Sequence, residues 1–353
     1  MEYEGNDWLD LTQEQTLEPD IPICDPHHHL WDRRVAGSSA TQMRYPKYLL
    51  EDFLVDIGSG HNVRSSVFVE ADAMYTASGP EELQSVGEVE FVQGAAAASA
   101  SGIYGESRVA AAIIGYANLK LGDNVRTVLE NLLAASPNRF RGIRHRVAWD
   151  SDPLFSRHPA PNEKSPSSSR NDGNELTLDE FRQGASVLST MGLIFEGLVY
   201  HPQLFDMAKF ARELPDLPIV LNHIGGLIRI GGYANSDSEV FPAWKEGIAA
   251  VAECPNVVIK LGGMGMPIVG FDWHERDKPI GSQELADNMS PYIEHCINEF
   301  GTQRCMFESN FPVDKVSYSY NIMYNAFKLL TKGFDSNDRN AMLHDNAVKL
   351  YQI

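Results

Sequence analysis

The sequence predicts a single α/β domain with a (β/α)8 barrel (TIM barrel), and three observations lead to this fold class. Short apolar, strand-like runs alternate with helical stretches along the 353 residues. Eight such strand-then-helix units follow one another without a break, which is the order expected of a barrel of parallel strands. The first strand ends in histidines, whereas an open doubly wound sheet, the rival fold, would place a glycine-rich dinucleotide turn there.

The predicted strands are short and mostly apolar, as expected of parallel strands that helices cover. In chain order they span 22–27, 63–70, 109–117, 141–146, 193–200, 218–222, 256–261 and 304–308. The predicted helices lie near 82–100, 123–135, 178–190, 203–213, 242–253, 284–300, 316–332 and 336–351. Three of them have start signals, namely Asp123, Thr177 three residues before Glu180, and Ser336.

Two segments stand outside this repeating pattern. Residues 1–20 are acidic and predict an N-terminal extension that is flexible or draped over the surface, ahead of a barrel domain at 21–353. Residues 151–176 are rich in Ser, Pro, Asn and Asp and predict an insertion after the fourth strand. On a barrel this insertion lies over the mouth, so it is either a plain surface loop or a lid.

Composition limits the partners. The formal net charge of −19, from 29 basic and 48 acidic residues, argues against binding to nucleic acid or to an anionic membrane. We find no signal-like amino terminus and no apolar run that would span a bilayer. The four cysteines lack Cys-x-x-Cys spacing and suit buried free thiols, so a reduced, cytoplasmic location is expected. The partner is then a small molecule, and the sequence leaves a homo-oligomer open.

The run from Asp25 to His29 follows the first apolar strand directly. In extended backbone His27 and His29 share one face with Asp25 behind them, while His28 points the other way. Two imidazoles at i and i+2 can bind one divalent ion, because neutral imidazole is a common metal ligand. The alternative is a histidine cluster at a surface turn.

Polar groups also follow the other predicted strands, and the carboxyl ends of barrel strands carry the active site in this fold. Burial of so many polar groups without a partner would cost about 2–7 kcal/mol each. These residues are Glu70 and Asp72, Arg144 and His145, His201, Asn222 and His223, Lys260, Glu308 and Asn310. Plainer alternatives remain open: an ion pair between Lys260 and Glu308, a structural role for His145, and a surface position for His274.

Taken together, six segments resemble the amidohydrolase-related family, a branch of the metal-dependent hydrolase barrels that includes lactonases and non-oxidative decarboxylases. They are DPHHHLWD (25–32), FRGIRHR (140–146), YHPQL (200–204), VLNHIGG (220–226), VVIKLGG (257–263) and RCMFESNFPVDK (304–315). The resemblance implies metal ligands at His27, His29, His201 and His223, with Zn²⁺ or Mn²⁺ bound, although some lactonases of the group work without a tightly held metal.

One position departs from the family pattern. The eighth-strand aspartate, which the family uses to activate water or to protonate the substrate, falls at Asn310. Asparagine cannot act as a general base. Glu308, Asp314 or a histidine would then carry the proton, or the reaction needs no base there.

Two activities follow from the resemblance. The first is hydrolysis of a lactone or related carboxylic ester, with His201, His223, Glu308 and Asn310 as candidate catalytic residues. Arg144 and Lys260 would bind an acidic substrate, with Glu70, His145 and His274 as further binding candidates. The second is metal-dependent decarboxylation of an aromatic or unsaturated acid. Aromatic residues in the loops favour a cyclic or aromatic carboxylate as ligand. A third alternative, a binding barrel without catalysis, rests on Asn310 alone.

Overall fold

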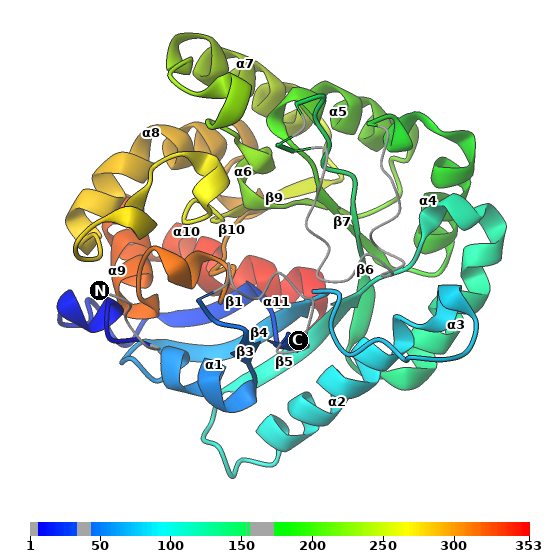
Figure 1. Ribbon diagram of the computed structural model, residues 1–353, viewed down its shortest axis with the longest axis horizontal. Helices are drawn as coiled ribbons and strands as arrows, with labels where there is room; N and C mark the ends of the chain where they lie inside the picture. Colours follow the sequence, from blue (N-terminus) through cyan, green and yellow to red (C-terminus); the bar gives the residue numbers. More distant parts are fainter. Residues whose placement is uncertain (1–5, 34–43, 153, 156–172) are drawn as a thin grey trace.

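The computed structural model describes residues 6–33, 44–152, 154–155 and 173–353. Eight parallel strands follow one another around a nearly closed barrel with helices outside (Figure 1). The predicted fold and all eight predicted strands are confirmed. The strands are β1 (Pro22–His28), β4 (Asn62–Val69), β5 (Arg108–Gly115), β6 (Phe140–Arg146), β7 (Ile194–Leu198), β8 (Ile219–Leu221), β9 (Val257–Leu261) and β10 (Cys305–Phe307).

The outer helices correspond to the predicted ones. They are α2 (Val86–Ala100), α3 (Val125–Ala135), α4 (Asp179–Thr190), α5 (Leu204–Glu213), α7 (Asp237–Ala252), α8 (Ser282–Phe300) and α9 (Tyr320–Leu330). The last predicted helix is divided into α10 (Ser336–Asn340), a π-helical turn (Ala341–Asp345) and α11 (Asn346–Tyr351). Two short helices of the described residues were missed, α1 (Leu50–Ile57) and α6 (His223–Gly226), because eight and four residues give at most about two turns of pattern.

The predicted start signals were wrong by one residue each. Asp335, and not Ser336, caps α10, since its carboxylate accepts hydrogen bonds from the backbone N–H groups of Asn337 and Asp338. Helix α3 is preceded by Asn124, and α4 by Leu178. The Thr177 hydroxyl instead donates to the carbonyl of Asn174. Ser, Thr and Asp suit several positions of a turn, so their presence locates a helix start only to within a residue or two.

The floor of the barrel is apolar, and the C-terminal helix closes it. In Figure 1 the red C-terminal segment lies across the ring of strands. Ala347 and Tyr351 of α11 are buried in one cluster with residues from six strands, namely Cys24, Val67, Val69, Ala112, Ile114, Ile194, Val220 and Met306. The backbone carbonyl of Tyr351 accepts a hydrogen bond of 2.7 Å from the Arg141 guanidinium of β6. Helix α11 is therefore anchored to the barrel wall.

The barrel closes at the ends of β1 and β10, where the chain turns after β10. The backbone N–H of Asn310 donates to the carbonyl of His27 at 2.9 Å, and that of His29 donates to the carbonyl of Phe311 at 2.8 Å. A parallel bridge joins His28 and Phe311. This seam brings the first strand to the residues just beyond the last one.

The two segments outside the repeat differ in how far they are described. Within the acidic extension, Glu14 accepts a hydrogen bond from the backbone N–H of Ser282, and Lys328 donates to the carbonyl of Leu17. Of the predicted insertion, residues 153 and 156–172 lie outside the described residues, so its two interpretations stay open. The four cysteines are buried and free, as predicted. Within the described ranges we find no helix with the length and apolar character needed to cross a bilayer.

Candidate active site

A layer of polar side chains lies inside the barrel above the apolar floor. On four successive strands the residue two positions after a floor residue is polar, and strand alternation places both on the same inner face. The floor residues Ile194, Val220, Val258 and Met306 are followed in this way by Glu196, Asn222, Lys260 and Glu308, and these four polar residues are fully buried. Packing alone does not favour such a layer, because each of these groups loses its hydration.

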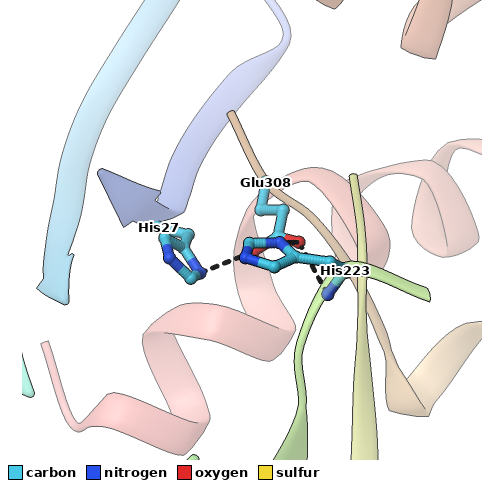
Figure 2. A group of neighbouring side chains, drawn as sticks. All are labelled: His27, His223 and Glu308. Carbon is cyan, nitrogen blue, oxygen red and sulfur yellow. Dashed lines mark hydrogen bonds and ion pairs between the residues drawn. The ribbon is translucent and has the colours of Figure 1, made fainter. Parts of the chain in front are cut away.

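The centre of this layer is a trio of His27, His223 and Glu308 (Figure 2). Figure 2 shows His27 at the end of β1 and the Glu308 carboxylate beside both rings. Each imidazole Nδ1 lies 2.7 Å from a different oxygen of that carboxylate. The contact to His223 is a hydrogen bond, and since an ionised carboxylate only accepts, we assign the Nδ1 hydrogen to His223. The Glu308 oxygen next to His27, Oε2, has no hydrogen-bond partner among the described residues.

Two cationic side chains border His27. The Arg144 guanidinium lies 3.2 Å from its Nε2, and the Lys260 ammonium lies 3.3 Å from its Nδ1. Both cations can only donate, so the neutral ring accepts a hydrogen bond from one of them at a time. Lys260 also forms an ion pair of 2.6 Å with Glu196. Burial, and next the charge of Lys260, hold the pKa of His27 well below its usual value. His27 is therefore a neutral imidazole at neutral pH.

His28 and His29 point to the sides of the strand that the alternation predicts, whereas Asp25 does not. His29 donates from Nδ1 to the carbonyl of Val69 at 2.7 Å, and its ring centroid lies 4.9 Å from that of His27. His28 points away from the barrel and stacks on Phe53 of α1, with ring centroids 4.1 Å apart. Asp25 differs from the prediction, because an irregular register between Asp25 and His28 separates it from the inner face. Its carboxylate accepts from the backbone of Ser309 and from the hydroxyl of Tyr320.

Asn310 lies at the seam, in the left-handed region with φ of 54°, which Asn adopts more readily than most residues. Its amide donates to Asp314 at 2.8 Å. The Asp314 carboxylate also accepts from the Tyr318 hydroxyl and from the backbone of Gly265, and burial raises its pKa to about 6. Three donors thus occupy Asp314, whereas no lysine or arginine ion pair reaches Glu308 within the described ranges. Of these two carboxylates, Glu308 is the one that lies against the imidazoles.

The trio fits a divalent metal ion in its donor chemistry. Two imidazoles and one carboxylate offer ligand atoms that all lie within 4.8 Å of one another. Such a mixed set suits Zn²⁺ or Mn²⁺. The Glu308 carboxylate also accepts from the backbone N–H of His223 at 3.1 Å, but it has no lysine or arginine partner among the described residues. It would therefore gain from a cation, because an unpaired buried charge is costly.

Comparison with known proteins gives the family. The family profile described as amidohydrolase matches residues 24–353. The chain belongs to the amidohydrolase family. Protein y4mH of Sinorhizobium fredii is 30% identical over 347 residues, which are 95% of this chain and 99% of that protein. An L-fucono-1,5-lactonase of Burkholderia multivorans is 23% identical over 255 residues, which are 70% of this chain and 73% of the lactonase.

Solved structures of amidohydrolase relatives share the fold. An amidohydrolase from Burkholderia multivorans with bound zinc superposes with a TM-score of 0.69 and 20% identity, over 94% of this chain and 99% of that one. A dihydroxybenzoic acid decarboxylase from Polaromonas, with bound manganese and 2-nitroresorcinol, gives a TM-score of 0.56 and 12% identity, over 94% and 96% of the two chains. At these identities the likeness supports the barrel and leaves the reaction open.

Two other candidate histidines, His201 and His274, do not join the trio. His201 follows β7, accepts from the backbone N–H of Ile228 at 3.4 Å and packs against the ring of Tyr233. His274 lies in a 3-10 turn, 21% exposed, with its Nε2 3.4 Å from the carboxylate of Glu275. The structure therefore brings together His27 and His223 of the predicted metal ligands, with His29 beside them. His201 remains a candidate on the resemblance, and His274 stays a prediction from the sequence.

The structure adds three residues that sequence reasoning missed. Arg146 lies two residues after Arg144 on β6, and both guanidiniums form ion pairs with Glu70, at 2.9 and 2.7 Å. Glu196 pairs with Lys260, so the ion pair considered between Lys260 and Glu308 is replaced by a neighbouring one. Tyr351 donates to Glu196 at 2.5 Å. A lone charge inside an otherwise apolar strand was the available signal for Glu196.

His145 points the opposite way from its neighbours Arg144 and Arg146, as strand alternation requires. Its ring packs between Tyr116 and Phe181, and its Nδ1 accepts from the backbone N–H of Leu119 at 3.4 Å. These contacts agree with the structural alternative for His145, on the outer side of the barrel wall. Burial, and next the charge of Lys120, lower its pKa from 6.5 to about 3.

This shift predicts a contribution to acid sensitivity. A lowered pKa in the folded protein adds stability that is fully present above pH 6.5 and is lost as the pH falls towards about 3. The free energy of unfolding should fall by up to about 1.4 kcal/mol per pH unit because of this group. In His145→Gln we expect that part of the slope to vanish. Urea unfolding between pH 7.5 and pH 5 tests this, and equal slopes in both proteins would contradict it.

Proposed function

We propose that the protein hydrolyses a small cyclic ester, a lactone, whose product is a carboxylate. The observation that carries this proposal is the buried carboxylate of Glu308 between two imidazoles, bordered by the cations of Arg144 and Lys260. Ester hydrolysis needs a polarised carbonyl, an acceptor for the proton of water and a cationic environment for the new carboxylate. The named lactonase substrate of the Burkholderia multivorans relative supports this reaction class.

The residues divide these tasks. His27 and His223 would hold a divalent ion through ring nitrogens, together with one oxygen of Glu308. When bound, such an ion polarises a carbonyl or lowers the pKa of water. The second oxygen of Glu308 accepts the proton that the attacking water loses. Arg144, a planar donor at the edge of the trio, binds the carboxylate that forms when the ring opens.

The test is acid release from a panel of five- and six-membered lactones of sugar acids, at neutral pH and with Zn²⁺ or Mn²⁺ added. We expect release with at least one member, and a loss of roughly 10²–10⁴-fold in His223→Ala. His295→Ala is the matched control, because His295 lies on the outer helix α8 and contacts the carbonyl of Lys245. Absence of release from every lactone, or undiminished release in His223→Ala, would remove the proposal.

Product analysis distinguishes the decarboxylase alternative from the lactonase proposal. It calls for a carboxylic acid that donates a proton near strand β10, and the family position for that acid is Asn310, whose amide is bonded to Asp314. Carbon dioxide release from dihydroxybenzoic acids, with no acid release from lactones, would favour it. We expect the opposite result.

A further inference from the structure

The polar layer has a lower tier that the proposed hydrolysis does not use. The Glu196 carboxylate lies below the trio on β7 and is fully buried. One of its oxygens accepts from Lys260 at 2.6 Å and from the Asn222 amide at 2.9 Å. The other accepts from the Tyr351 hydroxyl at 2.5 Å. Three strands and the C-terminal helix therefore meet at one carboxylate.

The two partners of Glu196 in the barrel wall, Lys260 and Asn222, each lie next to a histidine of the trio. Lys260 lies 3.3 Å from Nδ1 of His27. Asn222 directly precedes His223, whose backbone has the rare positive φ of 52°. The chain at His223 is also confined, because a Cβ on Gly263 would come within 2.5 Å of the His223 side chain. A small displacement of Asn222 or of Lys260 would be transmitted to the rings that Glu308 bridges.

A buried ion pair of this kind is difficult to explain by stability. Both side chains of the Lys260–Glu196 pair have no exposure, and desolvation of two charges offsets most of their attraction. Apolar residues of similar volume would continue the floor of Ile194, Val220 and Met306 below. The desolvation cost of this ion pair has an explanation if the pair fixes the geometry of the trio above it.

We propose that Glu196 and Tyr351 are positioning residues, which hold Lys260 beside His27 and Asn222 at the start of the His223 turn. Tyr351 reaches Glu196 from the C-terminal helix, and its ring lies under the Lys260 ammonium, 5.6 Å from ring centroid to nitrogen. The C-terminal helix thereby acts on the trio through two intervening side chains. The proposal rests on the proposed function for its catalytic consequence, but its geometry is independent of the substrate.

The test reads the histidine rings directly. The ¹⁵N signals of the imidazoles, assigned with His27→Gln and His223→Gln, report which nitrogen carries the hydrogen. In the wild type we expect a single tautomer in each ring, with hydrogen on Nδ1 in His223. In Tyr351→Phe and Glu196→Gln we expect mixed tautomers at His27 or His223 and a Zn²⁺ affinity that falls by roughly 10–100-fold for Glu196→Gln, the range seen when groups behind metal ligands are removed.

Two control variants distinguish positioning from general loss of structure. Tyr45→Phe removes another buried tyrosine hydroxyl, one with no hydrogen-bond partner among the described residues. Asp56→Asn disrupts another buried ion pair, the one that Asp56 forms with Lys315 at 2.7 Å. We expect both controls to keep the wild-type histidine signals, even where they lower the thermal midpoint.

The outcomes are decisive for this inference whatever the reaction is. Unchanged histidine signals in Tyr351→Phe and in a folded Glu196→Gln overturn it, as do equal changes in the Asp56→Asn control. If Glu196→Gln does not fold, Tyr351→Phe decides alone. Altered signals in a protein that opens no lactone would uphold the positioning role and reject the proposed function.

Discussion

Glu308→Gln is expected to abolish most of the activity while the barrel stays folded. Glutamine has nearly the same volume, but it offers one oxygen and one NH₂ group where the carboxylate offers two acceptors. The 2.7 Å contact with Nδ1–H of His223 requires the amide oxygen, so the NH₂ group turns towards Nδ1 of His27. The oxygen that would accept the proton of water is then lost. We expect kcat to fall by roughly 10²–10⁴-fold.

Steady-state kinetics on the lactone identified in the panel measure this effect, with thermal unfolding to show that the variant is folded. Glu253→Gln is the control, because Glu253 is an exposed carboxylate paired with Arg212 on the helical surface. If Glu308→Gln kept kcat within about threefold, well inside the effect expected for loss of a proton acceptor, Glu308 would not be that acceptor.

Gly263→Ala is expected to damage both stability and the site. Gly263 has φ of +71°, and a Cβ there would meet the Cβ, Cγ and Nδ1 atoms of His223 at about 2.5 Å. Either the ring leaves Glu308 or the β9 loop moves away. We expect the free energy of unfolding to fall by about 2–5 kcal/mol, which combines left-handed strain with the cost of overpacking. Activity should fall at least tenfold, because His223 is displaced.

Gly192→Ala separates the two contributions. Gly192 has a similar φ of +67°, but no atom lies within 4 Å of its added Cβ. We expect this control to lose only about 1–2 kcal/mol, the cost of the backbone conformation, and to keep full activity. Urea unfolding and lactone kinetics on both variants measure the difference. Equal losses in the two variants would show that the contact with His223 is not the cause.

The succession of strands and helices along the chain could be predicted because each element has its own local sequence pattern. Each β-strand is a short apolar run, and every one after the first is followed by a recognisable helical stretch, so this alternation was enough to predict the barrel. The family motifs then located His27, His223 and Glu308 at strand ends. Helix α1 and the exact helix starts depended on weaker signals, since eight residues and a few turn-forming side chains fit several local structures.

Contacts between distant residues were harder to predict. Lys260 has Glu308 on the next strand and Glu196 two strands before it, and sequence spacing does not say which carboxylate it meets. Tyr351 lies at the end of a terminal helix, where nothing in the pattern shows that it reaches the interior of the barrel. His201 illustrates the converse, because a histidine at a strand end need not turn towards its fellow histidines.

The seam between β1 and the residues after β10 has a consequence for the closure of the barrel. His27 lies on β1 and Glu308 directly follows β10, and the backbone hydrogen bonds from Asn310 and His29 join the same two edges. A ligand that binds both His27 and Glu308 therefore also holds these two edges of the barrel together. By mass action such a ligand would add to the resistance of the native state to unfolding, at ten times its dissociation constant by about 1.4 kcal/mol. Ligand binding at the candidate site and the stability of the barrel closure are therefore coupled at this edge.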